Sequence, residues 1–374
     1  MKKILLPTCL STLLLPLLFF MNPVNAAGEG ELKDGLVNPG FYDKPSWFKQ
    51  SFLDLPDDLD DANASNKTIF LYFHQDGCPY CKKMLEVNFT DKDIVNKMKQ
   101  HYDVLEINMW GDRPVTLMDG TEVTEKEFAR QMKVMFTPTL VALDPQGRPM
   151  FRMNGYYAPD RFTVVLDYLL LKKLKLASGD KVIPTFKEYY QQKKQQKEDS
   201  QKNKQKTAKP SSGLFTEKFI VKTDNLKQLI ESSQRPVMVL FEQADCDECK
   251  ELHGNVFRRL PVYQKLKKYT ITQVDINSPE PIITPDGRKM SQQEYAEELG
   301  IQYTPSIYFY QPGQKGAEHK PVFKAEAYLK SFHMQVLFDY VLQQAYLEEP
   351  EFQRYVQDYA EKLRADGKEV DLWK

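Results

Sequence analysis

The sequence has few cysteines, few histidines and almost no charge imbalance. Only five cysteines and five histidines occur in 374 residues, and the net charge is −1. A disulfide-stapled scaffold is excluded, because such proteins are shorter and spread their cysteines along the chain. The balanced charge gives no sign of a nucleic-acid partner. Four of the five cysteines instead form two Cys-x-x-Cys pairs, Cys78/Cys81 and Cys246/Cys249.

After Met21 the sequence has no apolar run long enough to span a bilayer. The one long run, Ile4 to Met21, follows a basic start and precedes small residues at Val24 and Ala26. This pattern predicts a secretory signal peptide over residues 1–26 that is removed from the mature chain. A membrane anchor is the alternative, but the run is short for a bilayer and two prolines interrupt it. We expect an exported protein, periplasmic or extracellular, without stable membrane insertion after signal removal.

Composition divides the rest of the chain into two folded units. The segment 191–213 is rich in Lys and Gln and has almost no apolar side chain, so it cannot bury enough surface to fold. The predicted organisation is a mobile leader at 27–46, domain 1 at 47–190, a linker at 191–213, domain 2 at 214–363 and a tail at 364–374.

The two units are repeats of each other. Cys78 and Cys246 are 168 residues apart, and Thr137-Pro138 and Thr304-Pro305 are 167 apart. Several such landmarks occur in the same order at nearly one offset, which indicates duplication of a whole domain rather than an array of short repeats.

Each unit reads as alternating strands and helices. Apolar, β-branched and aromatic residues predict a buried strand at 68–73 and again at 237–241, directly before each cysteine pair. A helix follows each pair, and Thr124 and Ser291 begin further helices with capping boxes. The order predicts an α/β fold in which each unit is a mixed sheet flanked by helices, with a C-terminal helical extension.

This order places each cysteine pair where a strand leads into a helix. Unpaired backbone N–H groups and the helix dipole stabilise a thiolate there, so such a cysteine is a better nucleophile than usual. Zinc binding by both pairs is the alternative, but the pairs lie too far apart for common structural zinc spacings. We expect redox chemistry, with no metal and no cofactor.

These motifs resemble the thioredoxin superfamily. The resemblance rests on Cys-x-x-Cys at a strand-to-helix junction and on the Thr-Pro that opens a strand some 60 residues later. The segments Asn108–Val115 and Phe136–Leu140 are similar to exported bacterial thioredoxins of the sulfur-oxidation-associated type. The similarity covers nearly all of both units, so the chain resembles tandem thioredoxin-like domains.

The resemblance implies a role for each site residue. Cys78 and Cys246 would attack, while Cys81 and Cys249 would resolve the mixed disulfide, giving redox-active disulfides Cys78–Cys81 and Cys246–Cys249. Pro138 and Pro305 would be cis and face the cysteines. The backbone at Thr137-Pro138 and Thr304-Pro305 would bind an extended substrate strand.

Two positions depart from the thioredoxin pattern. The usual buried Asp, six residues before the first cysteine, is replaced by Tyr72 and Leu240. The usual Trp immediately before that cysteine is replaced by Gly77 and Asp245. Another group or water would therefore have to handle the proton.

The second motif is the more acidic one. Since like charges disfavour a thiolate, we expect Cys246 to have a higher pKa than Cys78 and its disulfide to be harder to reduce. Electrons would then run from the second pair toward the first. Ordinary first-turn helix acids are an equally good account of Asp247 and Glu248. The acids nearby are Glu242, Asp245, Asp247, Glu248 and Glu251.

The predicted function is exported thiol–disulfide exchange on protein cysteines, in the reducing direction. A reductase in an oxidising compartment needs electrons, for which a membrane thiol transporter is the expected donor. One alternative is a catalytic unit joined to a partner-binding unit with little chemistry. Another is a disulfide oxidase or isomerase.

Overall fold

The computed structural model describes residues 44–180, 182–202, 213–244, 246–301, 303–312, 319–368 and 370. The expected signal peptide, most of the leader and residues 203–212 of the expected linker lie outside them. Among the described residues, no helix combines the length and apolarity that crossing a bilayer requires. The described part of residues 47–190 is called the first half below, and that of 214–363, together with the residues that follow it, the second half.

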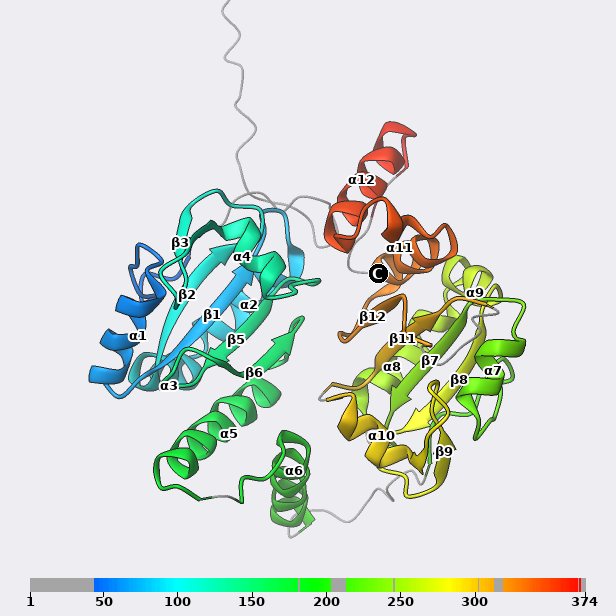
Figure 1. Ribbon diagram of the computed structural model, residues 1–374, viewed down its shortest axis with the longest axis horizontal. Coiled ribbons are helices and arrows are strands. Elements are labelled where there is room, and N and C mark those ends of the chain that lie inside the picture. The colour runs from blue at the N-terminus through cyan, green and yellow to red at the C-terminus, as the bar shows by residue number, and fades with distance from the viewer. Residues whose placement is uncertain are drawn as a thin grey trace, which may run out of the picture. The chain divides into compact units, whose positions relative to one another are not determined.

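The first half is built on one four-stranded mixed sheet. The central strand β1 (Thr68–His74) pairs in parallel with β2 (Tyr102–Asn108) and antiparallel with β5 (Thr139–Leu143), as Figure 1 shows. The edge strand β6 (Pro149–Asn154) pairs with β5. The strands β3 (Pro114–Thr116) and β4 (Glu122–Thr124) form a small separate hairpin.

Local sequence signals explain where the helices of the first half begin. Asp54 caps α1 through the N–H of Asp57, and Thr124 and Glu127 form the predicted capping box of α4. The helices are α1 (Leu55–Ala64), α2 (Pro79–Val87), α3 (Lys92–His101), α4 (Glu125–Gln131), α5 (Pro159–Ala177) and α6 (Phe186–Lys202), with a 3-10 turn at Asn88–Thr90.

The second half repeats this plan. Its sheet has the order β8-β7-β11-β12, with β8 parallel to the central strand β7 and β11 antiparallel to it. The strands are β7 (Val237–Glu242), β8 (Thr270–Asp275), β11 (Ser306–Tyr310) and β12 (Phe323–Ala325), with the hairpin β9 (Pro281–Ile283) and β10 (Lys289–Ser291). The helices are α7 (Leu226–Ser232), α8 (Asp247–Gly254), α9 (Leu260–Leu266), α10 (Gln292–Glu298), α11 (Ser331–Leu342) and α12 (Phe352–Ala365), with 3-10 turns at Val256–Arg258 and Ala345–Leu347.

Alternate residues of each central strand enter different cores, because successive side chains of a strand point to opposite faces. In β1, Tyr72 packs in the core that contains Met84 of α2, whereas Phe73 packs in the core that contains Phe128 of α4. In β7, Leu240 and Phe241 divide in the same way. Both sheets are thus covered by helices on two faces, and the predicted α/β fold is confirmed.

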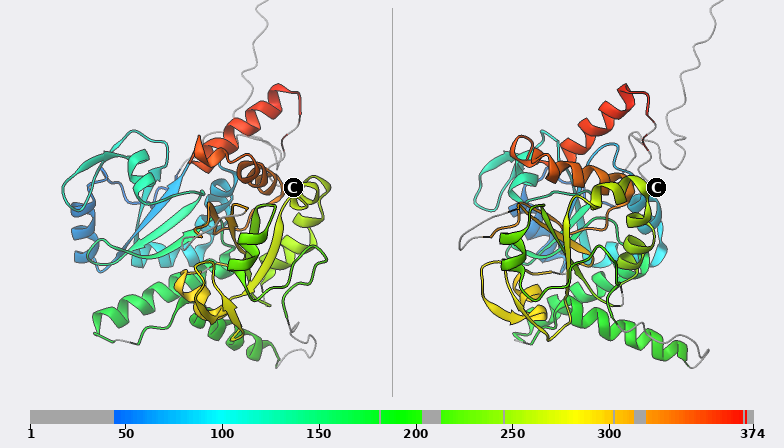
Figure 2. Two further views of the ribbon diagram at one scale, coloured as in Figure 1. Left: turned by 45° about the vertical axis from the view of Figure 1, so that its right-hand side comes forward. Right: turned by 90° about the vertical axis from the view of Figure 1, so that its right-hand side faces the viewer.

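The helices that follow the first sheet run beyond the expected domain end. The helix α6, the second of the two long green helices in Figure 2, continues to Lys202, so residues 191–202 of the expected linker are helical. At the other end of the chain, α12 is the expected C-terminal helical extension. Both sheets belong to one compact unit of the chain.

Candidate functional site

The first cysteine pair sits at the N-terminus of α2. Cys78 is the N-cap, and its Sγ accepts a hydrogen bond of 3.0 Å from the backbone N–H of Cys81. Pro79 occupies the first helical position, where no N–H is needed. Cys78 and Cys81 are joined by a disulfide. The end of β1 and the start of α2 therefore place the Cys78 sulfur where a helix stabilises negative charge.

The Thr-Pro segment lies against this sulfur. The peptide bond between Thr137 and Pro138 is cis, as the resemblance implied. The carbonyl oxygen of Thr137 lies 3.5 Å from the Sγ of Cys78. Because Thr137 lies two residues before β5, and β5 pairs directly with β1, the sheet itself brings the two segments together.

The second pair has the same geometry. Cys246 is the N-cap of α8, and its Sγ accepts a hydrogen bond of 3.0 Å from the backbone N–H of Cys249. The two cysteines are joined by a disulfide. The bond between Thr304 and Pro305 is cis, and the Thr304 carbonyl oxygen lies 3.4 Å from the Cys246 Sγ. The structure thus collects the eight residues predicted for the site into two groups of four.

This geometry agrees with what comparison with known proteins finds. The family described as thioredoxin-like domain matches residues 55–170 and again 223–341, which is more than half of the chain. The chain belongs to the thioredoxin-like family.

Individual relatives match parts of this thioredoxin-like protein. A thiol:disulfide interchange protein, DsbD of Photorhabdus laumondii, is 27% identical over 107 residues, which are 28% of this chain and 17% of that protein. A thioredoxin from Thermus thermophilus is 25% identical, covers 34% of this chain and 92% of its own, and has a TM-score of 0.28. The first two thioredoxin domains of Saccharomyces cerevisiae Eps1p are 14% identical and have a TM-score of 0.25. The match covers 77% of this chain and 96% of that chain.

A histidine–carboxylate pair lies at the end of β1, and its histidine is four residues before Cys78. The Nε2 of His74, at the end of β1, is 3.1 Å from a carboxylate oxygen of Glu106 on β2. Lys44 also binds Glu106, at 3.0 Å. Burial would raise the pKa of Glu106, but the hydrogen bonds and charges of His74 and Lys44 lower it to about 2. His74 thus has an electrostatic role as the ion-pair partner of Glu106.

The second half holds its own pair, built from different elements. Glu242 at the end of β7 is fully buried, and one carboxylate oxygen lies 2.9 Å from Nε2 of His253 on α8. Gln273 donates to the other oxygen at 2.6 Å, and the ring of Phe215 stacks on the imidazole. His253 lies one helical turn after Cys249, so the pair fills the layer between β7 and the cysteine helix.

Three of the acids near Cys246 are paired with other side chains in the structure. Glu242 is bound as described, and Glu251 accepts a hydrogen bond from Asn255. Glu248, between the two cysteines, forms a 2.9 Å ion pair with Arg161 of α5. Burial opposes the charge of this arginine, but Tyr157 and Glu248 raise its pKa. The predicted difference in thiol pKa between Cys246 and Cys78 remains a prediction, and these pairings reduce the difference that we expect.

The sequence did not predict the charged partners at either site. Glu106, Arg161 and also Glu217, which lies 3.6 Å from Nδ1 of His253, come from distant parts of the chain, so no local spacing marks them. The only local signal was His253, four residues after Cys249 on the same helix face, whose partner the sequence did not reveal.

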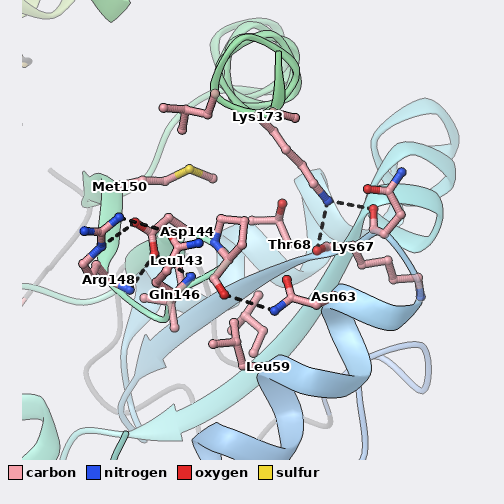
Figure 3. A pocket seen from close by; sticks show the side chains of 15 residues that line it. Leu59, Asn63, Lys67, Thr68, Leu143, Asp144, Gln146, Arg148, Met150 and Lys173 are labelled. Carbon is pink, nitrogen blue, oxygen red and sulfur yellow. Dashed lines mark hydrogen bonds and ion pairs between the residues drawn. The ribbon is translucent and has the colours of Figure 1, made fainter. Parts of the chain in front are cut away.

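One sizeable pocket lies away from both sites. Figure 3 shows it at the start of β1, the end opposite to Cys78, between α1 and α5. The Nζ of Lys173 binds the backbone carbonyl oxygens of Asn66 and Lys67 at 2.8 and 3.1 Å, and Asp144 pairs with Arg148. Its lining contains neither cysteine nor histidine, so it offers no redox group.

Within the described ranges, no group of three or more His, Cys, Asp or Glu side chains is placed to hold a metal ion. The expectation that the protein needs no metal stays a prediction, which metal analysis of the purified chain would test.

Replacing Glu106 by Gln should weaken the pH dependence of stability. The native pKa of Glu106 lies below its ordinary value, so its stabilisation is present above about pH 4.5 and is lost as pH falls toward 2. We expect Glu106→Gln to be less stable than the parent at pH 7, with the difference shrinking between pH 4.5 and 2. Thermal unfolding across this range measures it, and a difference that grows on acidification contradicts the assignment.

Replacing Glu242 by Ala should destabilise the second half strongly. The change leaves His253 and Gln273 buried without their acceptor, which costs about 3–5 kcal/mol when one partner of a buried pair is lost. Urea unfolding followed by circular dichroism gives the midpoint.

Glu251→Ala is the matched control for this change, because Glu251 is exposed on the same cysteine helix. We expect its effect to stay within about 0.5 kcal/mol. Equal effects of the two substitutions would show that the buried pair does not stabilise the fold.

Proposed function

We propose that the protein is an exported thiol–disulfide oxidoreductase that reduces protein disulfides. The observation that supports this best is the position of each first cysteine, which caps a helix and contacts the carbonyl oxygen before a cis-proline. Such a sulfur is stabilised as a thiolate and faces a backbone segment able to pair with an extended substrate.

The proposed reaction at the first site has two exchange steps. The Cys78 thiolate attacks one sulfur of the substrate disulfide, which forms a mixed disulfide and releases the other substrate sulfur as a thiolate. The Cys81 thiolate then attacks the Cys78 Sγ, closes the enzyme disulfide and frees the second substrate thiolate. Two electrons pass to the substrate, and the protons from the two enzyme thiols end on the substrate thiols.

The reducing direction and the export are parts of the proposal. The N-terminal signal pattern supports export, and the similarity to thiol:disulfide interchange protein DsbD supports a thiol relay as electron source. The chain spans about a sixth of that relative's length, 17%, so its activity is carried over only as a proposal. A membrane thiol transporter is the donor class that would return Cys78 and Cys81 to the dithiol.

A division of labour between the halves is the second candidate. In this alternative the second half binds partners, and most of the chemistry takes place at Cys78. The ion pair between Glu248 and Arg161 argues in the opposite direction, because it neutralises a negative charge close to Cys246.

The serine variants of the two attacking cysteines test this division. With dithiothreitol as donor and a small aromatic disulfide as substrate, Cys78→Ser should lose about 100-fold or more of the rate, because the nucleophile is gone. Cys246→Ser is the matched control and should keep at least about half of the rate if the first pair dominates.

The reverse order of these losses would move the principal centre to the second half. A double variant, Cys78→Ser with Cys246→Ser, that keeps the parent rate would contradict cysteine exchange as the function. Cys81→Ser should accumulate a mixed disulfide on Cys78, which mass spectrometry of the trapped species detects.

A further inference from the structure

The second residue between the cysteines contacts the opposite half in both motifs. In the first motif the ring of Tyr80 lies 5.6 Å from that of His333 in α11. In the second motif Glu248 pairs with Arg161 near the start of α5. Tyr80 and Glu248 are equivalent positions of the repeat, and α5 and α11 are equivalent helices. The contact is therefore reciprocal.

The residue before each Thr-Pro follows the same rule. Phe136 of the first half packs 5.7 Å from Phe352 in α12 of the second. Its equivalent, Tyr303, packs 5.4 Å from Tyr157 of the first half. Equivalent residues of the two motifs thus contact the opposite half, but Phe352 and Tyr157 belong to different elements, so the interface is only partly like that of a symmetric dimer.

Buried polar contacts make this interface specific. The indole N–H of Trp110 donates to Gln75 at 2.7 Å, and the amide of Gln75 donates to Gln353 of the second half at 3.2 Å. Gln353 is 6% exposed. Buried amides are costly unless they are paired, so they specify this docked arrangement.

Docking covers the redox sites. Cys78 is 2% exposed and Cys246 6%, and the backbone at Thr137 and Thr304 lies in buried residues. The cavity in front of Cys78 has about 110 Å³, and the second half forms part of its wall, through Tyr328, His333 and Gln353 among others. A cavity of about 150 Å³ holds one benzene ring. The space at Cys78 therefore admits a small group and excludes a folded protein.

The site at Cys246 is less confined. Its cavity has about 370 Å³, and the first half contributes Arg161 and Tyr190 to the wall, beside Lys193 of α6. The two halves hence differ in how completely each covers the other.

We propose that the second half determines what Cys78 can react with: docked, it restricts this cysteine to small disulfides, and folded protein substrates react only after the halves separate. This inference rests on the proposed function for its biological meaning, but the accessibility of Cys78 can be tested without catalysis. The residues that set the restriction are those of the interface, Tyr80, Gln75, His333 and Gln353.

Alkylation of Cys78 by reagents of two sizes tests the proposal. The full chain would carry Cys78 as its only cysteine, with Cys9, Cys81, Cys246 and Cys249 changed to Ser, and would react with N-ethylmaleimide or with a polyethylene-glycol maleimide. We expect the large reagent to react at least about tenfold more slowly than the small one, because it modifies only separated molecules.

Gln353→Arg should remove the discrimination. The larger, charged side chain cannot occupy the buried site beside Gln75, so we expect the large reagent to react about tenfold faster and the small one within about twofold of the parent. Gln357→Arg is the matched control, since Gln357 is exposed on the same helix, and both rates should stay unchanged. Small-angle scattering should show a larger radius of gyration for Gln353→Arg alone.

A second variant tests the proposal independently, in case Gln353→Arg does not fold. Arg130→Glu reverses the charge facing Glu351 at the exposed rim, where the two now lie 3.1 Å apart, and should speed the large reagent about threefold. Equal parent rates for both reagents would overturn the proposal, as would discrimination that survives in both interface variants while circular dichroism shows them folded. Failure of the proposed function would appear separately, as absent reduction of any disulfide by the wild-type chain.

Discussion

Each half is organised by the need to hold one sulfur atom at a helix N-terminus and against one carbonyl oxygen. The central strand ends just before the cysteine, and the neighbouring antiparallel strand begins just after the cis-proline. Their register pairs Phe73 with Thr139 in the first sheet and Phe241 with Ser306 in the second. A slip of this register would move every side chain of the strand to the other face. The buried strand cores therefore fix the redox geometry as well as the fold.

On this shared frame the halves carry different electrostatics. In the first half His74 and Glu106 bridge two neighbouring strands, whereas in the second Glu242 and His253 bridge a strand and the cysteine helix. Both pairs lie near the end of the central strand that leads to the cysteines. Each half thus pairs an acid with a buried imidazole, but different elements supply the two groups and only Glu242 is fully buried, so the two sites are not electrostatic copies.

The features that sequence could predict are local ones. Residue type and spacing identify the strands, the capping boxes, the Cys-x-x-Cys pairs and the Thr-Pro segments. Each of these features occurs at the equivalent place in both repeats. The ion pairs of Arg161 and Glu106 depend on packing between distant segments, which no spacing reveals. The helix at 191–202 was missed for another reason. Its Lys, Gln and Glu residues are good helix formers, and α6 starts on the buried Phe186, but the low apolar content favoured a linker.

Duplication on one chain also changes what the docking surface must achieve. Because the second half is tethered, its effective concentration near the first is high, and contacts that are weak between separate molecules suffice to close the interface. Such an interface can open again without unfolding either half. The same geometry bears on electron transfer between the two pairs. In the docked arrangement Tyr80 faces α11 and Glu248 faces α5, so each motif meets a helix of the other half rather than its cysteines. If the halves separate as we propose, direct exchange between the two disulfides would take place in the separated form, and the docked form would not support this relay.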